Sequence, residues 1–196
     1  LSLRQNAAAL AEARAAVARH ERSPLAHTAL ALVQIRAGDR EGARQSLERA
    51  LAADAAYAQA HAWKSFLLRG EGRLEEADAA ARRAVALAPH SSLARQSLAD
   101  ALFAQGQSRE AREEGARAVA LNPLSPGARV SLGRALLQEG EIERAVREAH
   151  RAVALDPDLE RIASRGGLLL DLLLGGPLRF LEPDLPRLLH GLPSRS

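Results

Sequence analysis

The side chains most able to do chemistry lie along this chain without the spacing that catalysis or metal binding requires. A helix that binds a metal places two histidines three or four residues apart, so that both rings reach one ion. No two of the six histidines have this spacing: they are His20, His27, His61, His90, His150 and His190. His27 and His61 occupy the same position in two successive copies of a unit that repeats along the chain, and we expect both rings to pack between helices. Because the chain also has no cysteine, we expect no metal, no disulfide and no cofactor.

The motifs of phosphate binding and acid–base catalysis are missing as well. A phosphate loop needs the pattern GxxxxGK[ST], but the only lysine, Lys64, follows Trp63 instead of glycine. Glu113 and Glu114 form a carboxylate pair with arginines three or four residues away. Such spacing favours helix-stabilising ion pairs on an outer, solvated face over general acid–base catalysis. The sequence therefore predicts a protein that is not an enzyme.

A unit as long as the segment 24–57 repeats along most of the chain without insertion. Its four complete copies begin at Pro24, Ala58, Ser92 and Pro126. A glycine recurs at the expected end of each first helix, at Gly38, Gly72, Gly106 and Gly140. The residue at such an end often has a left-handed φ, which glycine tolerates because it has no Cβ. A proline recurs near the end of the later units, at Pro89, Pro123 and Pro157. Each unit therefore predicts two helices joined by a tight turn, over 25–37 and 40–53 in the first copy.

Small side chains recur where two helices must approach closely. In the first helix a leucine precedes a small residue, as in Leu30-Ala31, Leu98-Ala99 and Leu132-Gly133. In the second helix, alanines recur seven residues apart on one face, as Ala43 with Ala50, Ala77 with Ala84, Ala111 with Ala118, and Ala145 with Ala152. This pattern, over residues 6 to about 174, resembles the tetratricopeptide repeat (TPR) family. The resemblance implies an all-α fold, a right-handed superhelical solenoid of antiparallel helix hairpins.

The period divides the chain into successive segments of one solenoid domain. Residues 1–23 are expected to form a partial repeat with a second helix only, and 160–176 the first helix of a further repeat. The complete repeats are 24–57, 58–91, 92–125 and 126–159. Residues 177–196 follow as a C-terminal cap or tail, with the alternative that this segment occupies a groove of this or another molecule. Because Ala55 stands where the later units have proline, we expect the second helix of the first complete repeat to continue into Tyr57.

In a TPR array, successive first helices line a concave groove that binds partners. The resemblance assigns the following residues to this groove: Leu25, Thr28, Leu32, Ile35, Arg36, Phe66, Arg69, Gln96, Asp100, Phe103, Val130, Arg134, Leu137 and Arg161. The lining leans apolar, which favours an amphipathic helix or an extended apolar peptide as the ligand, with the arginines contacting flanking acidic residues. The alternative for any single residue is that it packs between neighbouring first helices.

Chaperone-binding TPR domains carry a cluster of lysine and asparagine that clamps a terminal carboxylate. The corresponding positions of this chain are occupied by other residue types: Thr28, Leu32, Ala62, Phe66, Gln96 and Arg134. The resemblance therefore does not extend to that specialised role.

The charge pattern gives no sign of a nucleic-acid or membrane partner. The formal net charge is only +3, and acidic residues rather than aromatic ones alternate with the arginines. The apolar run 168–174 is too short to cross a bilayer. Only one of the 27 basic residues is lysine, and alanine and glycine are abundant, which indicates a GC-rich, bacterial coding sequence.

The sequence thus predicts a soluble protein-interaction scaffold whose groove binds a peptide or helix of a partner of unknown identity. Two alternatives stay open: a self-assembly module that forms homo-oligomers, or the non-catalytic TPR arm of a larger enzyme or of a secretion or assembly protein. The chain starts at Leu1 in the middle of a repeat, so we expect a segment of a longer or processed chain. Cytoplasm and periplasm are both compatible with the sequence.

Overall fold

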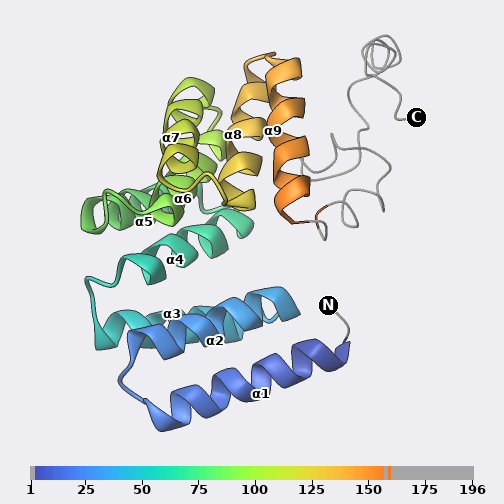
Figure 1. The fold of residues 1–196 in the computed structure, drawn as a ribbon. Helices are drawn as coiled ribbons and strands as arrows, with labels where there is room; N and C mark the ends of the chain where they lie inside the picture. The colour runs from blue at the N-terminus through green and yellow to red at the C-terminus, as the bar shows by residue number, and fades with distance from the viewer. Residues whose placement is uncertain (1–2, 157–158, 160–196) are drawn as a thin grey trace.

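The computed structural model describes residues 3–156 and residue 159, and all regular secondary structure in this part is helical. Nine α-helices follow one another among these residues (Figure 1): α1 (Leu3–Arg19), α2 (Pro24–Ala37), α3 (Arg40–Ala53), α4 (Ala58–Gly70), α5 (Leu74–Leu87), α6 (Ser92–Ala104), α7 (Ser108–Leu121), α8 (Pro126–Gln138) and α9 (Ile142–Leu155). The predicted all-α array of sequential hairpins is confirmed. The segments assigned to a further first helix and to a cap or tail lie outside the described residues.

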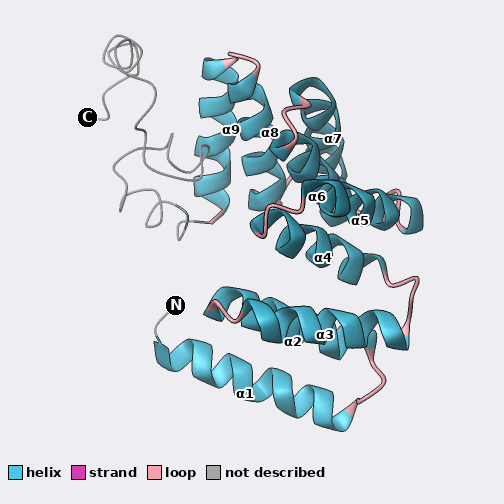
Figure 2. Cartoon of the chain, turned by 180° about the vertical axis from the view of Figure 1, so that it is seen from behind, coloured by secondary structure: helices cyan, strands magenta, loops and turns pink. Residues whose placement is uncertain are grey.

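The helices pair as hairpins, α2 with α3, α4 with α5, α6 with α7 and α8 with α9. We call the first member of each hairpin a first helix and the second member a second helix. The end of α1 at Arg19 lies one repeat length before the end of α3 at Ala53, so α1 corresponds to a second helix. Successive hairpins turn relative to one another, as the change of direction from α2 to α8 shows (Figure 2).

Contacts between neighbouring hairpins define an inner and an outer side of the array. Consecutive first helices touch, α2 with α4, α4 with α6 and α6 with α8. Among the described helices, no consecutive second helices make a comparable contact. The array therefore bends with its first helices on the inner side, and we call the surface of α2, α4, α6 and α8 on that side the inner face.

The tight turns form as the glycine pattern predicts. In the described part of the chain, positive φ occurs only at Gly38, Gly72, Gly106 and Gly140, with values between 77° and 82°. At the end of α2, the N–H of Gly38 donates to the carbonyl of Ile35 at 3.1 Å, and the N–H of Asp39 donates to that of Gln34 at 2.9 Å. These bonds satisfy carbonyls that the end of a helix leaves without partners.

The expectation that α3 continues into Tyr57 is wrong, because α3 ends at Ala53. Asp54 adopts an extended conformation, and its Oδ1 accepts a hydrogen bond of 2.8 Å from the N–H of Ala56. Asn122 accepts the same kind of bond, at 3.1 Å, from the N–H of Leu124. An Asx turn thus ends the helix without proline.

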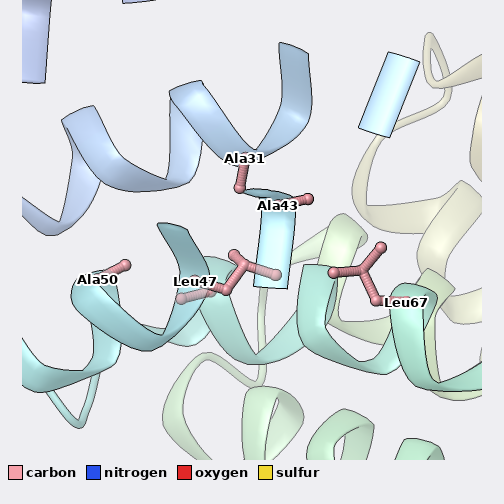
Figure 3. Close-up of a cluster of buried hydrophobic side chains, with 6 residues drawn as sticks. Ala31, Ala43, Leu47, Ala50 and Leu67 are labelled. Atoms are coloured by element: carbon pink, nitrogen blue, oxygen red, sulfur yellow. The ribbon is translucent and has the colours of Figure 1, made fainter. Parts of the chain in front are cut away.

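Alanine gives the core its close packing. The eight second-helix alanines that recur seven residues apart are all fully buried, with an exposed fraction of 0%. In the first hydrophobic cluster, Ala31 of α2 faces Ala43 of α3, while Leu47 and Leu67 fill the space beside them (Figure 3). Side chains this small bring two backbones close together, which fixes the distance between neighbouring helices.

Candidate partner-binding face

The centre of the inner face carries a ladder of charges that joins three first helices. The carboxylate of Asp100 on α6 lies between Arg69 of α4, at 4.0 Å from Nη2 to Oδ2, and Arg134 of α8, at 3.9 Å from Nη1 to Oδ1. The hydroxyl of Ser131 donates to Oδ1 of Asp100 at 2.8 Å. One acid thus faces two guanidinium groups, so this part of the inner face keeps an excess of positive charge.

Both arginines of the ladder also lie over aromatic rings. The guanidinium carbon of Arg69 is 5.4 Å from the ring centroid of Phe66, and that of Arg134 is 4.6 Å from that of Phe103. Trp63 packs edge-on against Phe66 with 5.9 Å between ring centroids. Cation–π attraction therefore holds the arginines close to the surface and combines charged and apolar groups in one patch.

Burial makes the charge of Arg134 costly. Desolvation lowers the pKa of the Arg134 guanidinium; Asp100 raises that pKa, and the like charge of Arg69 lowers it further. The Nε of Arg134 is buried and has no hydrogen-bond partner. An additional carboxylate beside Arg69 and Arg134 would therefore stabilise the charged form.

A small hollow of about 20 Å³ opens beside this ladder between α4 and α6. Trp63, Phe66, Leu93 and Asp100 are among the residues that line it. Phe66 is exposed, with 41% of its surface accessible, although phenylalanine is usually buried. The sequence analysis did not assign Trp63 to the groove. The one signal for such a role is that Trp63 stands three residues before Phe66 on α4.

The predicted groove residues differ in how much surface they offer. Leu25, Arg36 and Phe66 are exposed. Those that are half-buried are Leu32, Ile35, Arg69, Gln96, Asp100, Phe103, Val130, Arg134 and Leu137. Thr28 is only 4% exposed, so it packs inside the array. This agrees with the alternative that a single predicted groove residue packs between helices instead of facing the groove. Arg161 lies outside the described residues.

Three half-buried groove residues also support the core. Ile35 packs against the first hydrophobic cluster, Phe103 against the second and Leu137 against the third. Their inner edges therefore stabilise the fold, and only the remaining surface is available to a ligand.

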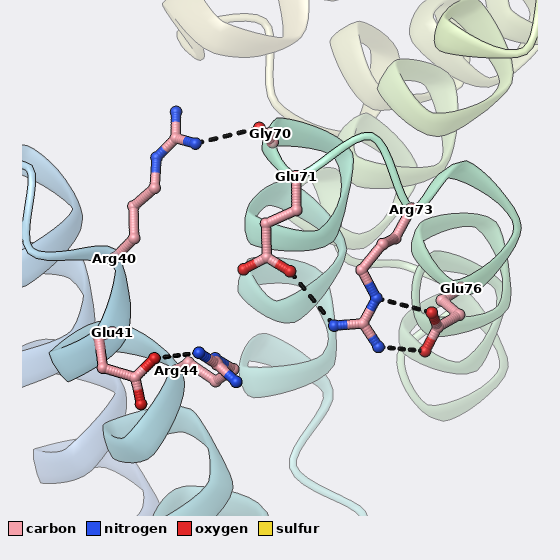
Figure 4. A network of polar contacts seen from close by, with 7 residues as sticks. All are labelled: Arg40, Glu41, Arg44, Gly70, Glu71, Arg73 and Glu76. Carbon is pink, nitrogen blue, oxygen red and sulfur yellow. Dashed lines mark hydrogen bonds and ion pairs between the residues drawn. The ribbon is translucent and has the colours of Figure 1, made fainter.

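The second helices carry many ion pairs. On the surface around α3 and α5, Arg73 pairs with Glu71 at 3.2 Å and with Glu76 at 2.6 Å, while Arg44 pairs with Glu41 (Figure 4). The hydrogen bond from Arg73 lowers the pKa of the Glu76 carboxyl. These pairs agree with the helix-stabilising role predicted for carboxylates in the second helices.

One carboxylate of these helices is not solvated as expected. Glu114 is only 8% exposed, because Arg95 of the preceding helix holds it at 2.8 Å from Nη1 to Oε2 and Arg117 pairs with its other oxygen. Glu148 has the same two kinds of partner, Arg129 at 2.7 Å and Arg151 at 2.6 Å. The prediction that Glu114 lies on a solvated face is therefore wrong.

Across residues 3–156 and 159, no three histidine, aspartate or glutamate side chains gather in a way that could hold a metal ion. Within the same residues, every helix is too short or too polar to cross a bilayer.

Comparisons with known proteins agree with the helical array. The family model described as tetratricopeptide repeat matches residues 28–92 and 97–160. A search of curated proteins gave no significant match.

Several solved structures are similar. TTC0263, a thermophilic TPR protein of Thermus thermophilus, is 21% identical, with a TM-score of 0.71 over 88% of this chain and 92% of that one. PilW, a type IV pilus biogenesis factor, is 21% identical, with a TM-score of 0.63 over 78% of this chain and 70% of its own. YrrB, a TPR protein with an unusual peptide-binding site, is 19% identical, with a TM-score of 0.55 over 91% and 96% of the two chains. At these identities the likeness shows the fold.

Proposed function

Because the chain belongs to the tetratricopeptide repeat family, whose typically non-catalytic members generally mediate protein–protein interactions, we propose that its inner face binds a peptide or amphipathic helix of a partner protein. The observation that carries the proposal is the patch around Phe66: an exposed aromatic ring beside the small hollow, with Arg69 and Arg134 on either side of Asp100. An apolar side chain would cover Phe66, and a neighbouring acidic side chain would pair with the arginines.

Two properties of this patch favour binding. Its guanidinium groups are held by Phe66, Phe103 and Asp100, so little side-chain freedom is lost when a ligand binds. Covering apolar surface contributes about 25 cal/mol per Å², and Phe66 supplies much of that surface at the centre of the patch. The resemblance of the fold to YrrB, which has a peptide-binding site, is consistent with this use of the array.

Replacing Phe66 by glutamate is expected to abolish binding of peptides selected on the wild-type protein from a displayed random library. The substitution removes the apolar contact and places a negative charge beside Arg69 and Asp100. Affinity measured by fluorescence anisotropy should fall by at least about tenfold, the loss that about 1.4 kcal/mol of binding free energy produces. The far-ultraviolet circular dichroism should stay unchanged, because Phe66 is not a core residue.

Leu124→Glu is the matched control, because Leu124 is 73% exposed but lies in the connection between α7 and α8, outside the predicted groove. This variant introduces the same charge at an exposed apolar residue and should keep wild-type affinity. If Phe66→Glu keeps it too, or if both variants lose it equally, the proposed use of the inner face is wrong.

A further inference from the structure

The repeats contain their own example of a carboxylate clamp, outside the inner face. In the third complete repeat, Glu114 of α7 lies between Arg95 of α6 and Arg117 of α7. In the fourth, Glu148 lies between Arg129 and Arg151. In both repeats the first helix provides one guanidinium group and the second helix provides the other, three residues after the glutamate.

The first complete repeat has the arginine of the second helix but lacks the glutamate. Arg49 occupies the position of Arg117, and Ser46 occupies the position of Glu114. The hydroxyl of Ser46 donates its hydrogen bond to Oε1 of Gln34 at 2.7 Å, and Ser46 has no charge with which to pair Arg49. Among the described residues Arg49 forms no ion pair, in contrast to Arg117 and Arg151.

A cleft of about 740 Å³ lies at this place, lined by residues of α1, of the α1–α2 connection, of the start of α2 and of α3. Arg14 of α1, Arg22 of the connection and Arg49 of α3 line it, all exposed, and the only acid in its lining is Glu21. None of the three arginines forms an ion pair with a described residue. Three cations without an acidic partner among the described residues thus face one cleft.

His27 occupies the position of Arg95 in this repeat and is among the residues that line the cleft. It is 5% exposed, with Nε2 at 2.7 Å from the carbonyl oxygen of Glu21, while Nδ1 is buried without a partner. The bond to the carbonyl fixes the ring, just as Arg95 bonds the carbonyl of Pro89 at 3.0 Å in the third repeat. The first helix therefore contributes no second guanidinium group here, and Arg14 and Arg22 supply the additional charge.

The next repeat and a neighbouring hollow differ from this cleft in their charges. In the next repeat Glu48 stands one repeat length after Arg14, so an acid replaces one of the cations. The hollow of about 210 Å³ between α3, α4 and α5 is lined by three cations, Arg44, Lys64 and Arg73, and by three acids, Glu48, Glu71 and Glu76. Its charges therefore balance, in contrast to those of the cleft between α1 and α3.

We propose that this cleft binds an acidic segment of a partner protein, with side-chain carboxylates of the segment paired to Arg14, Arg22 and Arg49. The clamps around Glu114 and Glu148 show that arginines at this repeat position bind carboxylate, and planar guanidinium groups match that group with two parallel hydrogen bonds. The lining of the cleft also contains apolar residues, Val17, Ala18, Ala52 and Ala53. A ligand with aliphatic as well as acidic side chains covers these residues, whereas a small anion does not.

The test uses a fluorescein-labelled peptide of alternating glutamate and leucine, blocked at both ends, in fluorescence anisotropy at low salt. Arg22→Gln and Arg49→Gln should each weaken binding by about three- to fivefold at low salt, the loss expected for one exposed ion pair. Arg83→Gln is the matched control, because Arg83 is exposed at the position of Arg49 one repeat later. All proteins in this test also carry Phe66→Glu, so that the inner face does not contribute to the binding that is measured. Arg83→Gln should stay within about twofold of the Phe66→Glu reference, since Arg83 does not line the cleft.

A second variant supplies the missing acid from the chain itself. Gln34→Leu with Ser46→Glu reproduces Leu102 and Glu114 of the third repeat. The new glutamate should pair with Arg49 and thereby weaken peptide binding to the same extent as Arg49→Gln, while the circular dichroism stays that of a folded array.

Four results would overturn the proposal. Equal binding of a peptide with glutamine in place of glutamate would show that carboxylates are not recognised. A loss in Arg83→Gln as large as in Arg49→Gln would show general electrostatic attraction. Displacement of the peptide by inorganic phosphate at matched ionic strength would assign the cleft to phosphate. If Phe66→Glu by itself abolishes binding of this peptide, the proposal for the cleft is overturned, while the function proposed for the inner face is still supported.

Discussion

Replacing Ala118 by tryptophan is expected to lower the free energy of unfolding by about 3 kcal/mol or more, because the alanine is fully buried between closely packed helices. The carbonyl of Ala118 accepts a hydrogen bond of 2.8 Å from the hydroxyl of Ser92, which shows how near α6 lies. An indole ring cannot fit there unless α7 moves away from its neighbours.

The damage should be local, because each repeat of a solenoid contacts only its neighbours. Amide hydrogen exchange should show lost protection in α6, α7 and α8, while α2 and α3 stay protected. Ala116→Trp on the exposed side of the same helix is the control and should change the free energy of unfolding by less than about 0.5 kcal/mol. Uniform loss of protection along the array would contradict the prediction.

Replacing Glu114 by alanine is expected to cost about 2 to 3 kcal/mol, the second-largest effect, because the glutamate is buried between Arg95 and Arg117. Its removal leaves Arg95, whose side chain is only 20% exposed, without its acid. Glu41→Ala removes an acid from an exposed pair with Arg44 and should cost less than about 0.5 kcal/mol. Urea unfolding of both variants measures the difference.

The second complete repeat suggests how to restore part of the stability that Glu114→Ala loses. It has His61 at the position of Arg95 and Ala80 at the position of Glu114, and Nε2 of His61 lies 3.0 Å from the carbonyl oxygen of Ala55. The double variant Arg95→His with Glu114→Ala copies that arrangement, so it should be more stable than Glu114→Ala alone. If the double variant is less stable, the unpaired charge of Arg95 is not the cause of the loss.

The sequence predicts the helices well because their signals are local. Glycines in left-handed φ and the alanines of the second helices recur once in each complete repeat, and each fixes a turn or a contact within its own hairpin. The end of α3 was predicted too late in the chain, and this error also has a local cause. Asp54 forms an Asx turn at the place where the later repeats have a proline close by.

Contacts between hairpins are harder to predict, since they depend on how two helices cross. Asp100 meets Arg134, which stands one repeat length after it, and also Arg69, although Phe66 is the residue one repeat length before it. The pairing therefore does not follow the repeat period on both sides. The burial of Glu114 depends on the reach of Arg95 from another helix. The period identifies which face a residue occupies, but neighbouring side chains decide how deeply it is buried.

The ladder of Arg69, Asp100 and Arg134 also distributes the stiffness of the array unevenly. It ties α4, α6 and α8 together along one line, whereas no ion pair among the described residues joins α2 to α4. Flexing should therefore concentrate where the first complete hairpin meets the second. A long ligand that contacts both regions would bind a rigid surface on α4, α6 and α8 and a more flexible one on α2.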